Sequence, residues 1–193
     1  MPQLLREIRQ FIAISQSHDI ARRYFVVNGF DGALTMLGLL MGFYFSEDTE
    51  SGTIVTVCLS AAIALAMSGL SSAYVSEVAE RKKEYRELQE AMVTDITGSA
   101  HEKAARWAPL VIAFTNGLSP LLISLVIISP FLLAPVGVVF PVGLFESSLG
   151  IAFSLIFFLG VFLGRVSGSF WLVAGLQTLG IALVTTLLIY LIT

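Results

Sequence analysis

The fold is decided by an apolar stretch that begins at Tyr24 and ends at Phe45 and reads YFVVNGFDGALTMLGLLMGFYF. A bilayer core about 30 Å thick is crossed by roughly 20 helical residues, so this stretch is long enough to span a membrane. Asp31 lies inside it, and a carboxylate at that depth costs on the order of 2.5–3.5 kcal/mol unless it meets a cation, a partner or water. The stretch therefore predicts a transmembrane helix, and Asp31 predicts that the protein handles a cation inside the membrane.

Four further apolar blocks also have the length of a membrane span. Hydrophobic residues make up 56% of the 193 residues and charged residues only 13%, which leaves too little polar surface to solvate a globule of this size. We therefore predict an all-α integral membrane protein with five transmembrane helices. The transmembrane domain covers residues 23–193, with spans at about 24–45, 53–76, 107–133, 147–166 and 170–192 and a short cytoplasmic helical loop at 77–106.

Basic residues lie on alternate sides of these spans. Arg22 and Arg23 precede the first span, the bases from Arg81 to Arg106 separate the second span from the third, and Arg165 ends the fourth. The positive-inside rule then places the N-terminus in the cytoplasm and the C-terminus outside. No organelle-targeting extension is readable, which favours the plasma membrane of a prokaryote.

The first 22 residues are predicted to form an amphipathic helix that lies on the cytoplasmic membrane surface and anchors the first span. Apolar side chains recur there at helical spacing, opposite the polar ones: Leu4, Leu5, Ile8, Phe11 and Ile12 against Arg6, Arg9 and Gln10. Cys58 is the only cysteine, which excludes an intramolecular disulfide, and we interpret it as a small packing residue.

The second apolar span continues into a polar helical pattern without a break. Neither Gly nor Pro occurs between Gly69 and Gly98, and the intervening residues are strong helix formers, so we expect one helix that projects into the cytoplasm. Its glutamates recur at i, i+3, i+7 and i+10, which places them on one face: Glu77, Glu80, Glu84 and Glu87. This acidic stripe either binds a divalent cation or is a solvated face paired with bases such as Arg81 and Lys83.

Short motifs in these spans resemble those of the vacuolar iron transporter family. The first span has Gly-x-Asp-Gly-x-x-Thr from Gly29 to Thr35, similar to the family's Asp-Gly-Leu-Thr signature. The third span has Asn116-Gly117-Leu118-Ser119-Pro120-Leu121, which looks like its Gly-x-x-x-Pro-Leu segment. Other similar segments are Ser68–Tyr74, Glu80 with Tyr85–Leu88, the Gly-rich end Gly160–Gly168, and Gln177–Gly180. The resemblance covers about residues 20–193.

The resemblance implies a transporter that exchanges divalent metal, Fe²⁺ or Mn²⁺, for protons and exports the metal from the cytosol. It also implies a homodimer whose translocation path runs between the subunits, with the metal as substrate and no permanently bound cofactor. Together with the acidic stripe, it leads us to expect a transport path that includes Asp31, Thr35, Asn116 and Met67, and metal ligands at Asp31, Glu80, Glu84 and Glu87. A simpler alternative is that Asp31 only hydrogen-bonds Thr35 or a neighbouring backbone group.

Two features depart from the family's pattern. The family commonly has a methionine in the second span at the position that is Gly69 here, and Met67 lies about 200° around the helix from that position. The loop at 77–106 is too short for the family's full cytoplasmic metal-binding domain, so any cytosolic site is reduced to an acidic entry funnel. Without a methionine at position 69, the sequence does not predict selectivity for iron over other divalent metals.

Four glycines in the predicted spans are candidates for helix packing. Gly38 and Gly42 in the first span, and Gly160 and Gly164 in the fourth, permit close helix packing and, by family analogy, dimer contacts. Pro120 can kink the third span.

No catalytic motif occurs and the basic residues are explained by topology, so we expect neither an enzyme nor nucleic-acid binding. The alternatives to this transporter are a non-transporting membrane scaffold or regulatory subunit of the same fold, and a transporter of another cation.

Overall fold

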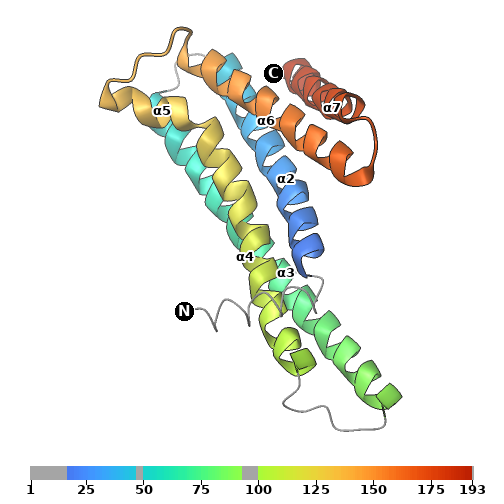
Figure 1. The fold of residues 1–193 in the computed structure, drawn as a ribbon. Coiled ribbons are helices and arrows are strands. Elements are labelled where there is room, and N and C mark those ends of the chain that lie inside the picture. The colour runs from blue at the N-terminus through green and yellow to red at the C-terminus, as the bar shows by residue number, and fades with distance from the viewer. Residues whose placement is uncertain (1–16, 47–49, 93–99, 193) are drawn as a thin grey trace. The chain divides into compact units, whose positions relative to one another are not determined.

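The computed structural model describes residues 17–46, 50–92 and 100–192, and these residues are almost entirely helical (Figure 1). The elements are α2 (Ser17–Phe45), α3 (Ser51–Met92), α4 (Ala100–Ile127), α5 (Ser129–Leu133), the 3₁₀ helix η1 (Ala134–Val136), α6 (Leu144–Ser167) and α7 (Trp171–Ile192). Five of these helices are long and apolar enough to cross a membrane, and the described ranges contain no strand. The predicted all-α fold is confirmed. Most of the predicted amphipathic helix at 1–22 lies outside the described residues.

The second helix, α3, is a single element of 42 residues. At 1.5 Å per residue it is about 63 Å long, roughly twice the thickness of a bilayer core. Its apolar part is followed by the charged part that begins at Glu77, as expected from the absence of Gly and Pro between Gly69 and Met92. The predicted continuous helix is confirmed, and its projection into the cytoplasm stays a prediction.

The third predicted span differs from the structure at its end. We predicted one helix to residue 133, but α4 ends at Ile127 and the short helix α5 begins at Ser129. Pro130 has no N–H group to donate to the carbonyl of Val126, and the Ser129 hydroxyl donates to that carbonyl instead, at 2.7 Å. The proline therefore ends the regular helix, and the hydroxyl satisfies the acceptor that it leaves.

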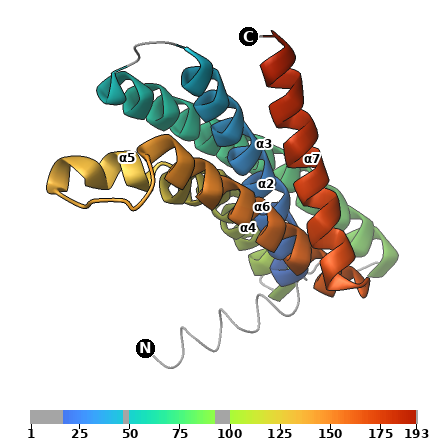
Figure 2. The same ribbon diagram turned by 90° about the horizontal axis from the view of Figure 1, so that it is seen from above.

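The last two helices, α6 and α7, form an antiparallel pair that packs through small residues (Figure 2). Gly168 ends α6 in the left-handed conformation, at φ 71°, which turns the chain back towards α7. A Cβ at Gly160 would lie 2.8 Å from the carbonyl oxygen of Ala174, and one at Gly164 would lie 2.7 Å from the Ala174 Cβ. Both glycines therefore lie where α6 and α7 of the same chain approach closely.

The described helices fall into two compact units, which we treat separately. The first combines the chain up to Phe25 with Ala66–Leu118, and the second combines Val26–Leu65 with Ser119–Thr193. In the second unit, α2 contributes a buried row at i, i+3, i+4, i+7 and i+8, comprising Ala33, Met36, Leu37, Leu40 and Met41. Cys58 is fully buried in the same core, which confirms its assignment as a packing residue.

Candidate functional site

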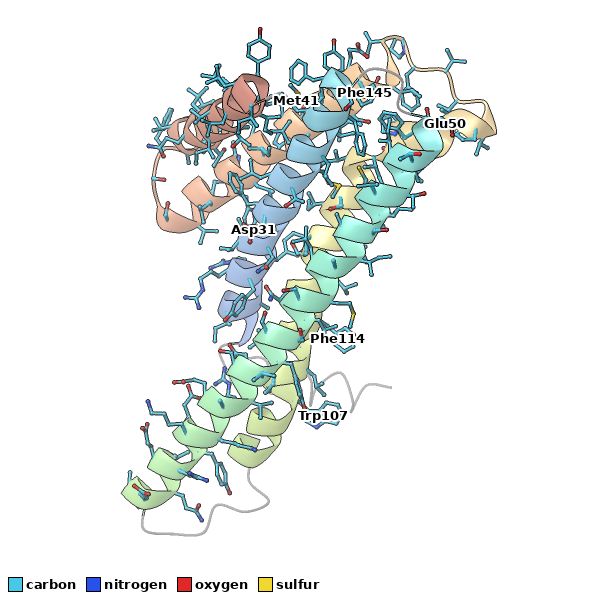
Figure 3. All side chains as sticks on the ribbon, turned by 180° about the vertical axis from the view of Figure 1, so that it is seen from behind. Asp31, Met41, Glu50, Trp107, Phe114 and Phe145 are labelled. Atoms are coloured by element: carbon cyan, nitrogen blue, oxygen red, sulfur yellow. The ribbon has the colours of Figure 1, made fainter. Side chains whose placement is uncertain are left out.

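Asp31 lies on α2 in the second unit, and its side chain is exposed on the surface of the single chain (Figure 3). Within the described ranges it makes neither a hydrogen bond nor an ion pair. The segment around it, Ile20–Phe45, is one of the candidate membrane spans. The described residues therefore place a carboxylate on the outside of an apolar helix, and none of their charged groups is paired with it.

The outward direction of Asp31 follows from the packing of the two glycines beside it. A Cβ at Gly32 would lie 2.8 Å from the Pro120 Cα, and one at Gly29 would lie 2.9 Å from the Ser119 Oγ, so both glycines face α4 at close range. With 3.6 residues per turn, Asp31 is turned about 130° away from the middle of that contact. The motif that contains Asp31 thus packs its glycines inwards and turns its carboxylate outwards.

Thr35 follows Asp31 by one helical turn and is half-buried on the same face. Elsewhere in the apolar helices, hydroxyls donate to the carbonyl one turn earlier, as Thr115 does to Val111 at 2.8 Å. Thr35 makes no such bond in the part of the chain that the structure describes, and no bond joins it to Asp31. The described residues therefore do not show the hydrogen bond between Asp31 and Thr35 that the simpler alternative requires.

Two glycines continue this face of α2. Among the described residues, Gly38 has one neighbour at van der Waals distance, the Ile189 Cδ1 at 3.7 Å from a built Cβ, and Gly42 has none within 4 Å. We call Asp31, Thr35, Gly38 and Gly42 the α2 stripe. It combines two oxygen-bearing side chains with two residues that leave the backbone uncovered, and it forms the candidate functional site.

Asn116 belongs to the first unit and is buried between α3 and α4. Its Nδ2 donates to the carbonyl oxygen of Gly69 at 2.6 Å, across 47 residues of sequence. A Cβ at Gly117 would lie 2.7 Å from the carbonyl oxygen of Ala66, so the two helix backbones approach closely here. The predicted path residue Asn116 is thus engaged in holding α3 against α4.

The same contact explains the departure at Gly69. A Cβ there would already lie 3.2 Å from the carbonyl oxygen of Asn116, which leaves no room for the longer side chain that the family pattern has. Met67, two residues earlier, is 59% exposed and lies away from this contact. In the first unit, Gly69 therefore accepts a hydrogen bond from Asn116 of α4, whereas the resemblance predicts a methionine at this position.

The glutamates that follow the apolar part of α3 are mostly ion-paired within their own helix. Arg81 approaches Glu84 at 2.8 Å and Glu77 at 3.8 Å, and Lys83 approaches Glu87 at 3.9 Å. Glu80 is exposed. Among the described residues, no group of three or more His, Cys, Asp or Glu side chains is close enough to hold a metal ion. Within a single chain the acidic stripe thus has the contacts of a solvated, ion-paired face.

Two polar residues of the second unit were not singled out from the sequence. The hydroxyls of Ser124 and Ser148 are fully buried and have no hydrogen-bond partner within the described part of the chain. A serine in an apolar helix usually bonds its own backbone, so its sequence context carries no sign of this state. They mark the places in this core where a bound water would be favourable.

Comparisons with known proteins place few constraints on this site. No protein-family model matches the chain, and no solved structure matches it. The chain is similar to an uncharacterized protein of the archaeon Methanocaldococcus jannaschii, with 25% identity over 173 residues, which cover 88% of this chain and 87% of that protein. The likeness extends over nearly the whole length of both chains.

Proposed function

We propose that this protein is a divalent metal cation transporter that works as a homodimer, with Asp31 as the carboxylate that binds metal or proton within the membrane. One observation carries the proposal. Asp31 is exposed on a membrane-span helix and has no hydrogen bond or ion pair among the described residues. Leaving a carboxylate in that position against lipid costs several kcal/mol, on the order of 2.5–3.5, so a cation, a proton or a partner is needed there.

The α2 stripe supports a second copy as that partner. Gly42 has no atom within 4 Å of a built Cβ, so another helix backbone can approach it closely. Two stripes that face each other across a two-fold axis bring together two carboxylates and two hydroxyls, the oxygen ligands that hard and borderline divalent cations prefer. A carboxylate can bind either a proton or a metal ion, and a bound metal ion displaces the proton. This competition is the minimum chemistry of metal/proton exchange.

The substrate and direction are taken from the resemblance to the vacuolar iron transporter family. It assigns Fe²⁺ or Mn²⁺ as the metal and the cytosol as the side from which metal is exported. By the positive-inside rule, the charge distribution favours a cytoplasmic location for the polar end of α3, and we propose that Glu80, Glu84 and Glu87 attract cations there as an acidic entry funnel. The archaeal relative agrees with a prokaryotic plasma membrane as the location.

A non-transporting scaffold or regulatory subunit is the second candidate, and two observations favour it. The glutamates of α3 are largely ion-paired to bases of the same helix, and Gly69 has no room for a sulfur ligand. A protein of this kind keeps the five-helix fold and the dimer but moves no metal.

The two candidates are separated by metal flux into liposomes that contain the purified protein and a pH-sensitive dye. We expect Fe²⁺ or Mn²⁺ uptake accompanied by proton movement, and loss of both in Asp31→Asn, which keeps the size of the side chain but removes its charge. Glu50→Gln is the matched control, because Glu50 is an exposed acid before the first turn of α3. Wild-type protein that moves no Fe²⁺, Mn²⁺, Co²⁺ or Zn²⁺, with a proton flux that Asp31→Asn leaves unaltered, would overturn the transporter assignment.

A further set of variants locates the essential site. The triple alanine variant of Glu80, Glu84 and Glu87 should slow uptake at low metal concentration and retain it at high concentration, because the funnel only concentrates the substrate. Complete loss in the triple variant, with activity retained in Asp31→Asn, would move the site from the membrane to the acidic helix.

The dimer has its own test, which does not depend on flux. Gly42→Leu fills the open part of the α2 stripe and should reduce energy transfer between donor- and acceptor-labelled subunits in liposomes. Gly150→Leu is the control, because Gly150 is an exposed glycine of α6 that also has nothing within 4 Å. Equal energy transfer in the two variants would exclude the α2 stripe from the subunit interface.

A further inference from the structure

The connection between α4 and α6 is apolar throughout its length. From Trp107 to Phe145 the sequence contains no charged residue, and from Pro130 to Gly143 it contains no polar side chain. We call Ser129–Gly143, which comprises α5, η1 and the irregular segment after them, the apolar connector. Connections that run through water normally carry polar residues, so this composition needs a physical reason.

The connector is not needed to cross the membrane. The uncharged part of α4, Trp107–Ile127, has 21 residues and is about 32 Å long, which matches a bilayer core by itself. The next span, Leu144–Ser167, begins directly after the connector and has 24 residues, or about 36 Å. The connector therefore joins two complete spans at one face of the bilayer.

One side of the connector is held by α6 and the other side is bare. Phe131 is buried, and its ring meets that of Phe145 edge to face, with centroids 5.0 Å apart. On the other side, Val136 is 78% exposed and Val139 is 90% exposed. In Figure 2 the segment after α5 extends outwards from α6 in the same unit. Other large apolar side chains exposed on the connector are Leu133, Val138 and Val142.

The helix that precedes the connector also exposes large apolar side chains. In the second unit, α4 exposes Leu122 and Val126, and Leu133 follows seven residues after Val126, on the connector. Leu122 and Val126 lie on a candidate membrane span, and the connector follows that span almost directly along the chain. Its continuity along the chain with a helix that belongs against lipid favours lipid as the partner of the connector as well.

The backbone of the connector limits how deep it can lie. The N–H groups of Gly137 and Val138 donate to carbonyls of the preceding turn, at 3.1 and 3.4 Å. Those of Val139, Phe140 and Val142 have no acceptor among the described residues. Unpaired backbone groups are excluded from the hydrocarbon region but are satisfied by water and headgroups at its boundary.

We propose that the apolar connector lies in the interfacial layer of the bilayer as a membrane anchor. Its valines contact the outer part of the acyl chains, its free N–H groups bond to headgroups and water, and Phe131 fixes it to α6 through Phe145. It holds the ends of α4 and α6 at a set depth. This inference requires only that the protein is in a membrane, and it does not depend on metal transport.

The depth of the connector can be measured by nitroxide labelling in liposomes. Single cysteines at Val136 and Val139 are introduced into Cys58→Ala, and collisions of each label with oxygen and with a water-soluble nickel chelate are compared. Glu50→Cys gives the reference for an aqueous position, and Leu183→Cys, exposed on α7, gives the reference for a lipid-facing position. We expect the ratio of oxygen to nickel collisions at both connector positions to lie above that at Glu50 and below that at Leu183.

Three results would overturn the proposal. A collision ratio equal to that of the Glu50 label would place the connector in water. Low access to both reagents, together with dipolar broadening between labels, would place it against a second copy of the chain. A ratio equal to that of the Leu183 label would contradict the interfacial depth, because it would put unpaired N–H groups in hydrocarbon.

Discussion

The contact between α6 and α7 supports a quantitative prediction for Gly160→Ala. A Cβ at Gly160 would contact the hydroxyl of Thr178 and would lie 2.8 Å from the carbonyl oxygen of Ala174. The carbonyl is backbone and cannot rotate away. Thr178 can rotate, but its hydroxyl donates to Ile156 of α6 at 3.1 Å, so moving it breaks a hydrogen bond between the two helices. The methyl group therefore has to push the helices apart or displace this bond.

The expected effect is the sum of three terms. Overpacking of this kind costs about 1–3 kcal/mol. Loss of a hydrogen bond between membrane helices lowers the free energy of unfolding by about a further 0.6 kcal/mol. Replacing Gly by Ala inside a helix raises it by about 1 kcal/mol. Gly160→Ala should thus lower the free energy of unfolding by about 0.5–2.5 kcal/mol. The same change at Gly150, on the same helix and with nothing within 4 Å, should leave it unchanged or raise it by up to about 1 kcal/mol.

The assay is reversible unfolding in mixed detergent micelles, followed by circular dichroism. The difference between Gly160→Ala and Gly150→Ala removes the helix-propensity term and should be about 1.5–3.5 kcal/mol. Adding Thr178→Ala should recover part of the loss, because the hydroxyl is one of the two obstacles. Equal stabilities for the two glycine variants would refute the close approach of α6 and α7 at this position.

The remaining predictions concern the first unit and use the same assay. Gly69→Met should destabilise the protein by about 1–3 kcal/mol because the side chain meets the Asn116 carbonyl, whereas Met67→Leu at an exposed position should stay within about 0.5 kcal/mol. Arg81→Met should cost about 1–3 kcal/mol because it leaves a buried glutamate without its cation, whereas Lys83→Met should change stability by less than about 0.5 kcal/mol. Similar stabilities within either pair would contradict the burial of that contact.

Much of the fold was predictable because membrane helices are encoded by length and apolar composition. Five long apolar blocks appear as five helices, and the absence of Gly and Pro after Gly69 correctly predicted the long α3. The break at Ile128 was missed because an apolar block does not distinguish a helix from a helical break. Pro130 was a visible signal for it, since the residue that precedes a proline is biased away from the helical region.

The site was less predictable because it depends on helix rotation. The sequence alone identifies Asp31 as an acid inside an apolar span. It does not predict which side of that helix is buried, because an almost uniformly apolar helix has no polar face. That rotation is set by the approach of Gly29 and Gly32 to α4, a contact between segments about 90 residues apart. The bond from Asn116 to Gly69 also joins residues far apart in sequence, 47 positions, so a residue predicted to line a path is found in a contact between helices.

The glycines of the chain divide into two groups, and the division bears on where Asp31 acts. At Gly32 and Gly160 a side chain would collide with the same chain, so close packing within the fold compensates for their weak helix propensity. Gly42 has no such compensation in the single chain, although it weakens α2 by about 1 kcal/mol relative to alanine. Gly150 is equally open, so an uncovered glycine does not identify an interface by itself. The α2 stripe differs from Gly150 because it also carries Asp31, and this combination is the reason for proposing a second helix on that face: the helix would cover Gly42 and supply a partner for the carboxylate.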